Sequence, residues 1–252
     1  ESLEAILALL QGDEPVTRAT DWFTLRDARL QLRPYTQPRF EVAVAAQISP
    51  AGPRAAGRFG LSLLSIGATT AGGFDVLGSH WTTMEERAEE FGTVVDRRNW
   101  RLVGPMHIAE TREQAFKNAR WGFERYIGYA NNNQPRYIVP AGRDPLEWFV
   151  ENNYGVCGTP DDAIALIERL QAKQGEFGAF LHQAHNWADW EATRRSYELY
   201  ARYVMPHFSR ANAPRAASYQ WAGDNRTEFS GKRQAAAKAM FDKHEAEKRA
   251  AE

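Results

Sequence analysis

The stretch FEVAVAAQISPAGPRAAGRFGLSLLSIG, residues 40–67, places two apolar runs on either side of a segment rich in small residues. Residues 40–46 are apolar almost throughout, which is typical of a strand that is covered on both faces in a parallel sheet. Residues 52–60 predict a short helix, and residues 60–67 predict the next buried strand. The stretch therefore predicts a strand, a helix and a second strand in close succession.

The same alternation continues along the chain, where a strand followed by a helix is predicted four times, over 40–58, 61–96, 101–130 and 177–206. Four such units make half of a (β/α)8 barrel, and a four-stranded open sheet is the alternative. A helix at the start and a hairpin around Thr20-Asp21 precede the first unit. Because the chain opens inside an uncapped amphipathic helix, we expect a truncated α/β barrel whose N-terminal part is missing.

A further helix is predicted between the third and fourth units. GTPDDAIALIERLQAKQG, residues 158–175, carries a capping signal at Thr159 and Asp162 and an apolar stripe. The helix that begins at Asp189 is expected to end at Pro206. We expect the barrel part to cover residues 1–209 and a polar helical tail to cover 210–252.

Composition excludes several classes of partner. Lys and Arg number 31 against 32 Asp and Glu, which gives a formal charge of −1 and no field that would attract nucleic acid. The single cysteine, Cys157, cannot form an internal disulfide, and no apolar run is long enough to cross a membrane. We expect a cytoplasmic protein that binds neither nucleic acid nor membrane.

The first candidate site follows the first strand, because ligands of such barrels bind at the carboxyl ends of the strands. Ser49 offers a hydroxyl beside the backbone N–H groups at the start of a helix, where an anion is favoured. Pro50 suits the first helical position. The alternative is that Ser49 only caps the helix, and residues alone leave both readings open.

Other candidates follow the later strands. His182, Gln183 and His185 lie at the end of the last strand and alternate between its faces, so at most two can enter one pocket. Their spacing and the lack of an acidic or thiolate partner argue against a metal site. The aromatic-rich connection over residues 131–157 predicts either a lid or a loop packed on the barrel. No catalytic residue is identified.

Four segments in this order resemble the C-terminal part, strands five to eight, of the bacterial luciferase-like flavin-dependent monooxygenases. The first is ESLEAILALLQGDEPVT with DWFTLRDARLQLRPYTQPRFEVAVA, and the others are ISPAGPRAAGRFGLSLLS, GTPDDAIALIERL and SYELYARYVMPHF. HIAETREQA and GRFGLSLLSIGAT look most like the limonene-monooxygenase branch, whose members epoxidise a monoterpene.

The resemblance implies a cytoplasmic, dimeric TIM-barrel enzyme that takes reduced FMN from a separate reductase. Reduced FMN would react with O2 to a C4a-peroxide, which oxygenates a small hydrophobic substrate such as limonene. Six residues would contact the flavin: Ile48, Ser49, Pro50, Ser65, Ile66 and Gly67. By the same comparison, residues 131–154 would close over the flavin, and His182, Gln183 and His185 would line the substrate pocket.

Two other functions remain open at this stage. The same barrel serves F420-dependent oxidoreductases, and Ser49 would suit the phosphate of either cofactor. A non-catalytic flavin-binding or dimerising fragment is the second alternative.

Overall fold

The centre of the molecule is a parallel sheet with the strand order β3-β4-β5-β8, seen in a computed structural model that describes residues 1–133 and 137–251. Its strands are β3 (Ala43–Ala46), β4 (Ser62–Ser65), β5 (Trp100–Gly104) and β8 (Ala179–His182). Ala46 pairs with Ser65 and Gly104 pairs with His182, so the strands end at one edge of the sheet. The predicted α/β class is confirmed, and the described residues form no closed barrel.

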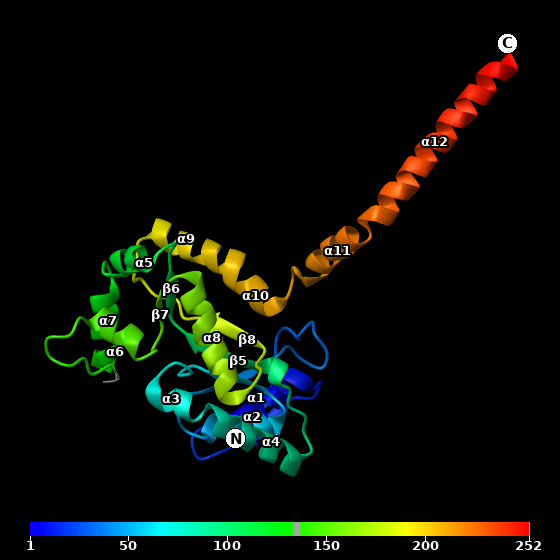
Figure 1. The fold of residues 1–252 in the computed structure, drawn as a ribbon. Helices are drawn as coiled ribbons and strands as arrows, with labels where there is room; N and C mark the ends of the chain where they lie inside the picture. Colours follow the sequence, from blue (N-terminus) through cyan, green and yellow to red (C-terminus); the bar gives the residue numbers. More distant parts are fainter. Residues whose placement is uncertain (134–136, 252) are drawn as a thin grey trace.

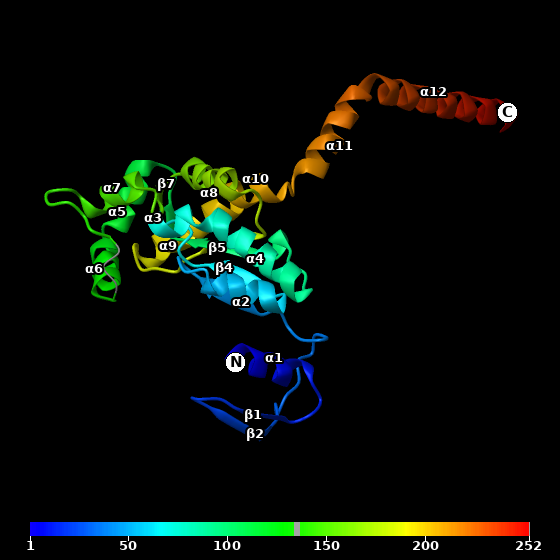
Figure 2. The ribbon, with the colours of Figure 1, turned by 90° about the horizontal axis from the view of Figure 1, so that it is seen from below.

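One face of the sheet is covered by helices from the segments that connect its strands. These are α2 (Ala51–Phe59), α3 (Ala71–Asp75), α4 (Leu77–Phe91) and α8 (Pro160–Gln174), and α2 lies along α4 (Figure 2). In the core beneath them, Trp81 stacks on Trp100 with ring centroids 5.2 Å apart. The Trp100 indole N–H donates to the buried Ser65 hydroxyl over 2.9 Å, which satisfies both polar groups.

The opposite face of the sheet is open. Ala43, Ala45 and Leu181 point to this face and are exposed, although they lie in strands of the central sheet. Strand β3 therefore departs from the expectation that residues 40–46 are covered on both faces.

The strand that opens the unit predicted over 101–130 is divided in two at Pro105. Strand β5 ends at Gly104, and β6 (Met106–Ile108) pairs instead with β7 (Val156–Gly158) in a separate two-stranded parallel sheet. Proline has no N–H to donate to a ladder, so the chain changes partner there. Strand β7 lies in the connection where no strand was predicted.

The prediction that one helix completes the unit over 101–130 is also wrong. It is broken into α5 (Arg112–Ala119) and α6 (Phe123–Asn133). Between them Gly122 donates its N–H to the Trp187 carbonyl over 2.8 Å, and a β-carbon at this position would collide with the backbone of Asn186. The close approach of the chain around residue 187 therefore breaks the helix.

The connection that follows contains a helix as well as β7. Helix α7 (Pro145–Glu151) begins where the Asp144 carboxylate accepts from the N–H groups of Leu146 and Glu147, both over 2.9 Å. Part of the predicted lid, residues 134–136, lies outside the described residues.

Helix α8 begins as predicted, with the side chains of Thr159 and Asp162 forming a capping box. Pro206, in contrast, does not end the following helix. Helix α9 (Trp190–Leu199) continues through a π-helical turn (Tyr200–Val204) into α10 (Met205–Ser209), with Pro206 in its first turn. A proline is tolerated there because the first turn of a helix needs no N–H donor from it.

The N-terminal part lies below α2 in Figure 2 and joins the core there, since Leu7 belongs to the same buried cluster as Ala46 and Ala56. Helix α1 (Ser2–Gln11) and the predicted hairpin of β1 (Val16–Ala19) with β2 (Thr24–Ala28) form the N-terminal part. Glu4 joins them to α2 through ion pairs with Arg18 and Arg58.

Helices α11 (Ala213–Asp224) and α12 (Arg226–Ala251) extend away from the other helices (Figure 1), and nearly all their described side chains are exposed. The division at residue 209 stays a prediction. None of the helices in the described ranges has the length and apolarity that crossing a membrane requires.

We expect Leu102→Ala to lower the free energy of unfolding by about 2–5 kcal/mol, because its fully buried side chain fills the core between sheet and helices. Urea unfolding measures this. Leu32→Ala is the control, since Leu32 is 87% exposed and its truncation should change stability by less than about 0.5 kcal/mol. Equal effects of the two substitutions would contradict the core assigned here.

Candidate functional site

A cavity of about 550 Å³ opens at the carboxyl ends of the central strands. Ile66 follows β4, Pro105 follows β5, and Gln183 and Ala184 follow β8, and all four line it. The rest of its wall consists of Thr69, Thr70, Tyr126, Tyr129, Ala130, Asn133 and Tyr137. Its volume falls in the range of about 300–1,000 Å³ that is usual for small-molecule sites.

Helix α6 supplies the wall that faces the strand ends, through Tyr126, Tyr129, Ala130 and Asn133. The helix rests on a buried aromatic cluster in which Phe123, Phe149 and Trp187 meet edge to face, with ring centroids 5.0 to 5.6 Å apart. Tyr126 packs on the same Trp187 ring at 5.3 Å. The cavity wall therefore has a rigid base.

The loop after β4 forms a second wall and is held by its own hydroxyl groups. Thr70 donates to the Gly67 carbonyl over 2.9 Å, and Gly73 packs so closely on Gly67 that a β-carbon would not fit. Thr69 donates to the carbonyl of Tyr154 over 2.7 Å. This bond ties the loop to the connection that follows α6, 85 residues further along the chain.

The residues predicted to bind a phosphate lie past the same edge, beside the cavity. Ile48 and Ser49 are exposed, and Pro50 is the N-cap of α2. The Ser49 hydroxyl accepts from the Ala51 N–H over 3.2 Å, and the Ile48 carbonyl lies 3.0 Å from Nε2 of His80. None of the three lines the cavity.

The second group of predicted flavin contacts divides between cavity and core. Ile66 lines the cavity and is 44% exposed. Ser65 faces the core and is engaged with Trp100, while Gly67 is buried in the loop. Period-two alternation along β4 separates Ser65 from Ile66.

The three predicted pocket residues after β8 also separate. Gln183 lines the cavity. His182 points the other way, with its ring 4.1 Å from that of Tyr200, and neither ring nitrogen has a hydrogen-bond partner among the described residues. His185 stacks on Trp187 at 4.0 Å, and its Nε2 lies 3.2 Å from the Met106 carbonyl.

Burial keeps these histidines neutral. Desolvation lowers the pKa of His182, His185 and the buried His107 from 6.5 to about 4. Burial likewise raises the pKa of the Cys157 thiol to about 12, so this cysteine is no thiolate nucleophile. Within the described ranges no group of His, Cys, Asp or Glu side chains is arranged to hold a metal ion.

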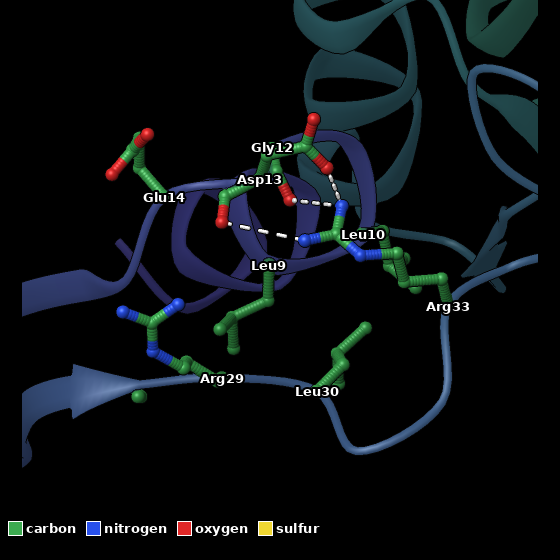
Figure 3. A pocket seen from close by; sticks show the side chains of 9 residues that line it. Leu9, Leu10, Gly12, Asp13, Glu14, Arg29, Leu30 and Arg33 are labelled. Carbon is green, nitrogen blue, oxygen red and sulfur yellow. Dashed lines mark hydrogen bonds and ion pairs between the residues drawn. The ribbon is translucent and has the colours of Figure 1, made fainter.

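A second, smaller cavity lies between α1 and the segment after β2, as Figure 3 shows. Its volume is about 150 Å³. Arg33 already donates there to the carbonyls of Gly12 and Asp13, both over 3.3 Å, and forms an ion pair with the Asp13 carboxylate. Its size and its internal pairing make it a weaker candidate than the strand-end cavity.

Three aromatic residues in and just before the predicted lid, Tyr126, Tyr129 and Tyr137, line the cavity. The sequence analysis missed Thr69, Thr70 and Asn133. A signal for the two threonines existed, because they follow a strand end in a loop with three glycines.

Comparison with curated proteins identifies close relatives. The chain is 39% identical over 249 residues to limonene 1,2-monooxygenase of Rhodococcus erythropolis, covering 98% of this chain and 64% of that protein. It is 38% identical over 229 residues to 4-hydroxyprotoasukamycin monooxygenase of Streptomyces nodosus subsp. asukaensis, covering 89% and 62%. The chain therefore spans less than two thirds of the length of these relatives.

A solved structure has the same fold. The oxygenating constituent of 3,6-diketocamphane monooxygenase from Pseudomonas putida, a type II Baeyer-Villiger monooxygenase in complex with FMN, superposes with a TM-score of 0.60. Its sequence is 24% identical, and the match covers 81% of this chain and 61% of that one. No model of a protein family matches the chain. These comparisons confirm the predicted resemblance to the luciferase-like monooxygenases.

We expect the free energy of unfolding to fall as the pH is lowered from about 7 to about 4, because the unfolded chain then protonates histidines that stay neutral when folded. Their pKa is lowered from 6.5 to about 4, so stability is complete above 6.5 and is lost toward 4. One such histidine contributes up to about 1.4 kcal/mol per pH unit.

Urea unfolding at several pH values measures the slope. His182→Phe should reduce the slope by about one proton, since this ring has no hydrogen bond to lose. His244→Gln, a substitution on the exposed tail, is the control and should leave the slope as it is. A slope that survives in His182→Phe would show that this histidine does not contribute.

Proposed function

Because the chain is a homologue of limonene 1,2-monooxygenase and of related luciferase-like monooxygenases, we propose that the protein is a flavin-dependent monooxygenase. It would use reduced FMN and O2 to insert one oxygen atom into a small hydrophobic organic molecule. The observation that carries the proposal is the strand-end cavity of about 550 Å³, whose position is that of ligand sites in such barrels.

We propose further that the four parallel strands are part of a complete (β/α)8 barrel in the whole protein, the fold predicted from the sequence. The order β3-β4-β5-β8 and the helices on one face support this. The open face of the sheet would then be the barrel interior. Residues 1–209 would belong to the barrel and 210–252 to a tail, and homodimerisation and a separate flavin reductase are parts of the same proposal.

The residues beside the cavity fit FMN. Ser49 is exposed at the start of the nine-residue helix α2, where its hydroxyl accepts from the Ala51 N–H. A hydroxyl that accepts one hydrogen bond can still donate its own hydrogen to an anion. The Ser49 hydroxyl and the amide of Ile48 would hold the phosphate, where the helix dipole favours an anion. Ile66 and Gly67 would lie along the flavin, with Ser65 supporting them from the core through its bond to Trp100.

The cavity wall consists of hydroxyl, amide and apolar groups. The described residues that line it are uncharged, and burial keeps His182 and His185, on either side of Gln183 in the sequence, neutral. When bound, reduced FMN supplies the electrons and the reaction with O2. The protein itself would orient the substrate between α6 and Gln183, and Tyr126, Tyr129 and Tyr137 would exclude water.

The test supplies the protein with reduced FMN, ¹⁸O2 and limonene as a probe of the substrate class. We expect one labelled oxygen atom in the product and the other in water, with FMN oxidised, which mass spectrometry and flavin absorbance measure. Reduced F420 replaces FMN in a parallel reaction. Turnover with F420 and none with FMN would assign hydride transfer instead, and binding of FMN without any oxidation would assign a non-catalytic flavin protein.

Ser49→Ala should weaken FMN binding by about 1–3 kcal/mol, the loss expected for one hydrogen bond to a charged group. Quenching of flavin fluorescence measures the affinity. Ser218→Ala, on the exposed helix α11, is the matched control and should bind FMN like the unmodified protein. If both variants bind FMN equally well, Ser49 does not contact the phosphate and only caps α2.

A further inference from the structure

A groove of about 490 Å³ runs between α5, β7 and α8, apart from the candidate site. Its residues come from these elements and from the end of α7: Arg112, Phe116, Val150, Asn153, Gly155, Val156, Cys157, Asp162, Ala165, Leu166 and Arg169. None of them lines the strand-end cavity. Residues 153–155 lie between the two, since Asn153 and Gly155 line the groove while the Tyr154 carbonyl bonds to Thr69 of the cavity.

The charges at one end of the groove are paired. Arg112 donates to both carboxylate oxygens of Asp162, over 3.0 and 2.5 Å. The same carboxylate accepts the Thr159 N–H over 2.8 Å in the capping box of α8. This pairing lowers the pKa of Asp162, first through the hydrogen bond from Arg112. Both carboxylate oxygens of Asp162 are therefore already hydrogen-bonded within the protein.

The charge at the other end is not paired. Arg169 lies two turns further along α8, and it forms no ion pair or hydrogen bond with the residues that the structure describes. Its guanidinium carbon stands 3.8 Å from the ring centroid of Phe74, and its Nη1 is buried without a partner. Lys173 lies 5.3 Å from the same ring and adds a second positive charge nearby.

An arginine in this state favours an anion. Burying a charged donor without an acceptor is costly, and the cation–π contact with Phe74 offsets only part of that cost. Nη1 is buried near Phe74, but Nε and Nη2 are not among the buried atoms, and this edge of the planar guanidinium could donate two N–H groups to one carboxylate. The groove thus offers a positive end without an internal counter-charge.

The stretch between the two ends is largely apolar. Phe116, Val150, Val156 and Leu166 line it, and the Cys157 thiol in the same wall is neutral because burial raises its pKa to about 12. An apolar chain would bury its surface there, which favours binding because apolar surface leaves water. The volume suits a small molecule better than a helix or a strand of a partner protein.

We propose that this groove binds a small amphipathic carboxylate, with its carboxylate at Arg169 and its apolar chain along Phe116, Val150 and Leu166. The proposal is independent of the flavin chemistry, because no residue of the strand-end cavity takes part in it. Binding in the groove and binding of FMN can therefore be measured separately.

Isothermal titration calorimetry of the protein with octanoate, in the absence of flavin, tests this. We expect one octanoate to bind, and Arg169→Gln to weaken its binding by about tenfold or more, the loss expected for a charge-assisted bidentate contact. Ala165→Trp should also abolish binding, since Ala165 is an exposed residue of α8 in the groove wall and the indole would fill the groove.

Arg54→Gln is the matched control. Arg54 is an exposed arginine of α2, so this substitution removes the same charge at a place away from the groove. Its octanoate affinity should equal that of the unmodified protein. Circular dichroism confirms that each variant is folded, and Ala165→Trp keeps the test valid if Arg169→Gln is unstable.

Three outcomes would overturn the proposal. The first is no octanoate binding, and the second is unchanged binding in both Arg169→Gln and Ala165→Trp. The third is binding of another probe as tight as that of octanoate. Equal binding of inorganic phosphate would show that the apolar chain is not recognised, and equal binding of 1-octanol would show that the carboxylate is not. Weaker binding of both probes than of octanoate supports the amphipathic ligand.

Discussion

Parallel pairing of four short strands is the constraint on which the rest of the structure depends. Because β3, β4, β5 and β8 run in one direction and in register, the residues after each strand gather at one edge of the sheet. Ile66, Pro105 and Gln183 meet there although they are far apart in the sequence. The buried bond from Trp100 to Ser65 joins β5 to β4 within this arrangement and keeps both polar groups satisfied.

The two walls of the cavity are held by contacts between residues that are far apart in the sequence. The aromatic cluster under α6 brings Phe123 and Phe149 onto Trp187. The Thr69 bond to Tyr154 then fixes the loop after β4 against the connection that carries α7. Both walls are thus anchored by contacts outside the cavity, and a wall that is already held in place lowers the entropic cost of binding.

Features encoded by neighbouring residues could be predicted from the sequence. The capping box of Thr159 and Asp162 and the hairpin of β1 with β2 are examples. Features set by distant contacts could not. The break at Gly122 depends on the chain around Trp187, and β7 exists because Pro105 releases β6 to a new partner. Helix α7 was missed although Asp144-Pro145 is a local start signal, because seven residues are too few to show a helical period.

The same alternation of faces decides which polar residues could serve chemistry. After β8, Gln183 enters the cavity while His182 turns toward Tyr200, and along β4 Ile66 enters while Ser65 turns into the core. The histidines thus lie where burial lowers their pKa to about 4, and the cavity keeps uncharged groups. Among the described residues, the wall consists of hydroxyls, amides, apolar groups and aromatic rings, which can bind and orient a ligand but include no strong acid or base. Such a wall suits a reaction whose redox chemistry is carried by a cofactor, with the protein providing position and a dry environment.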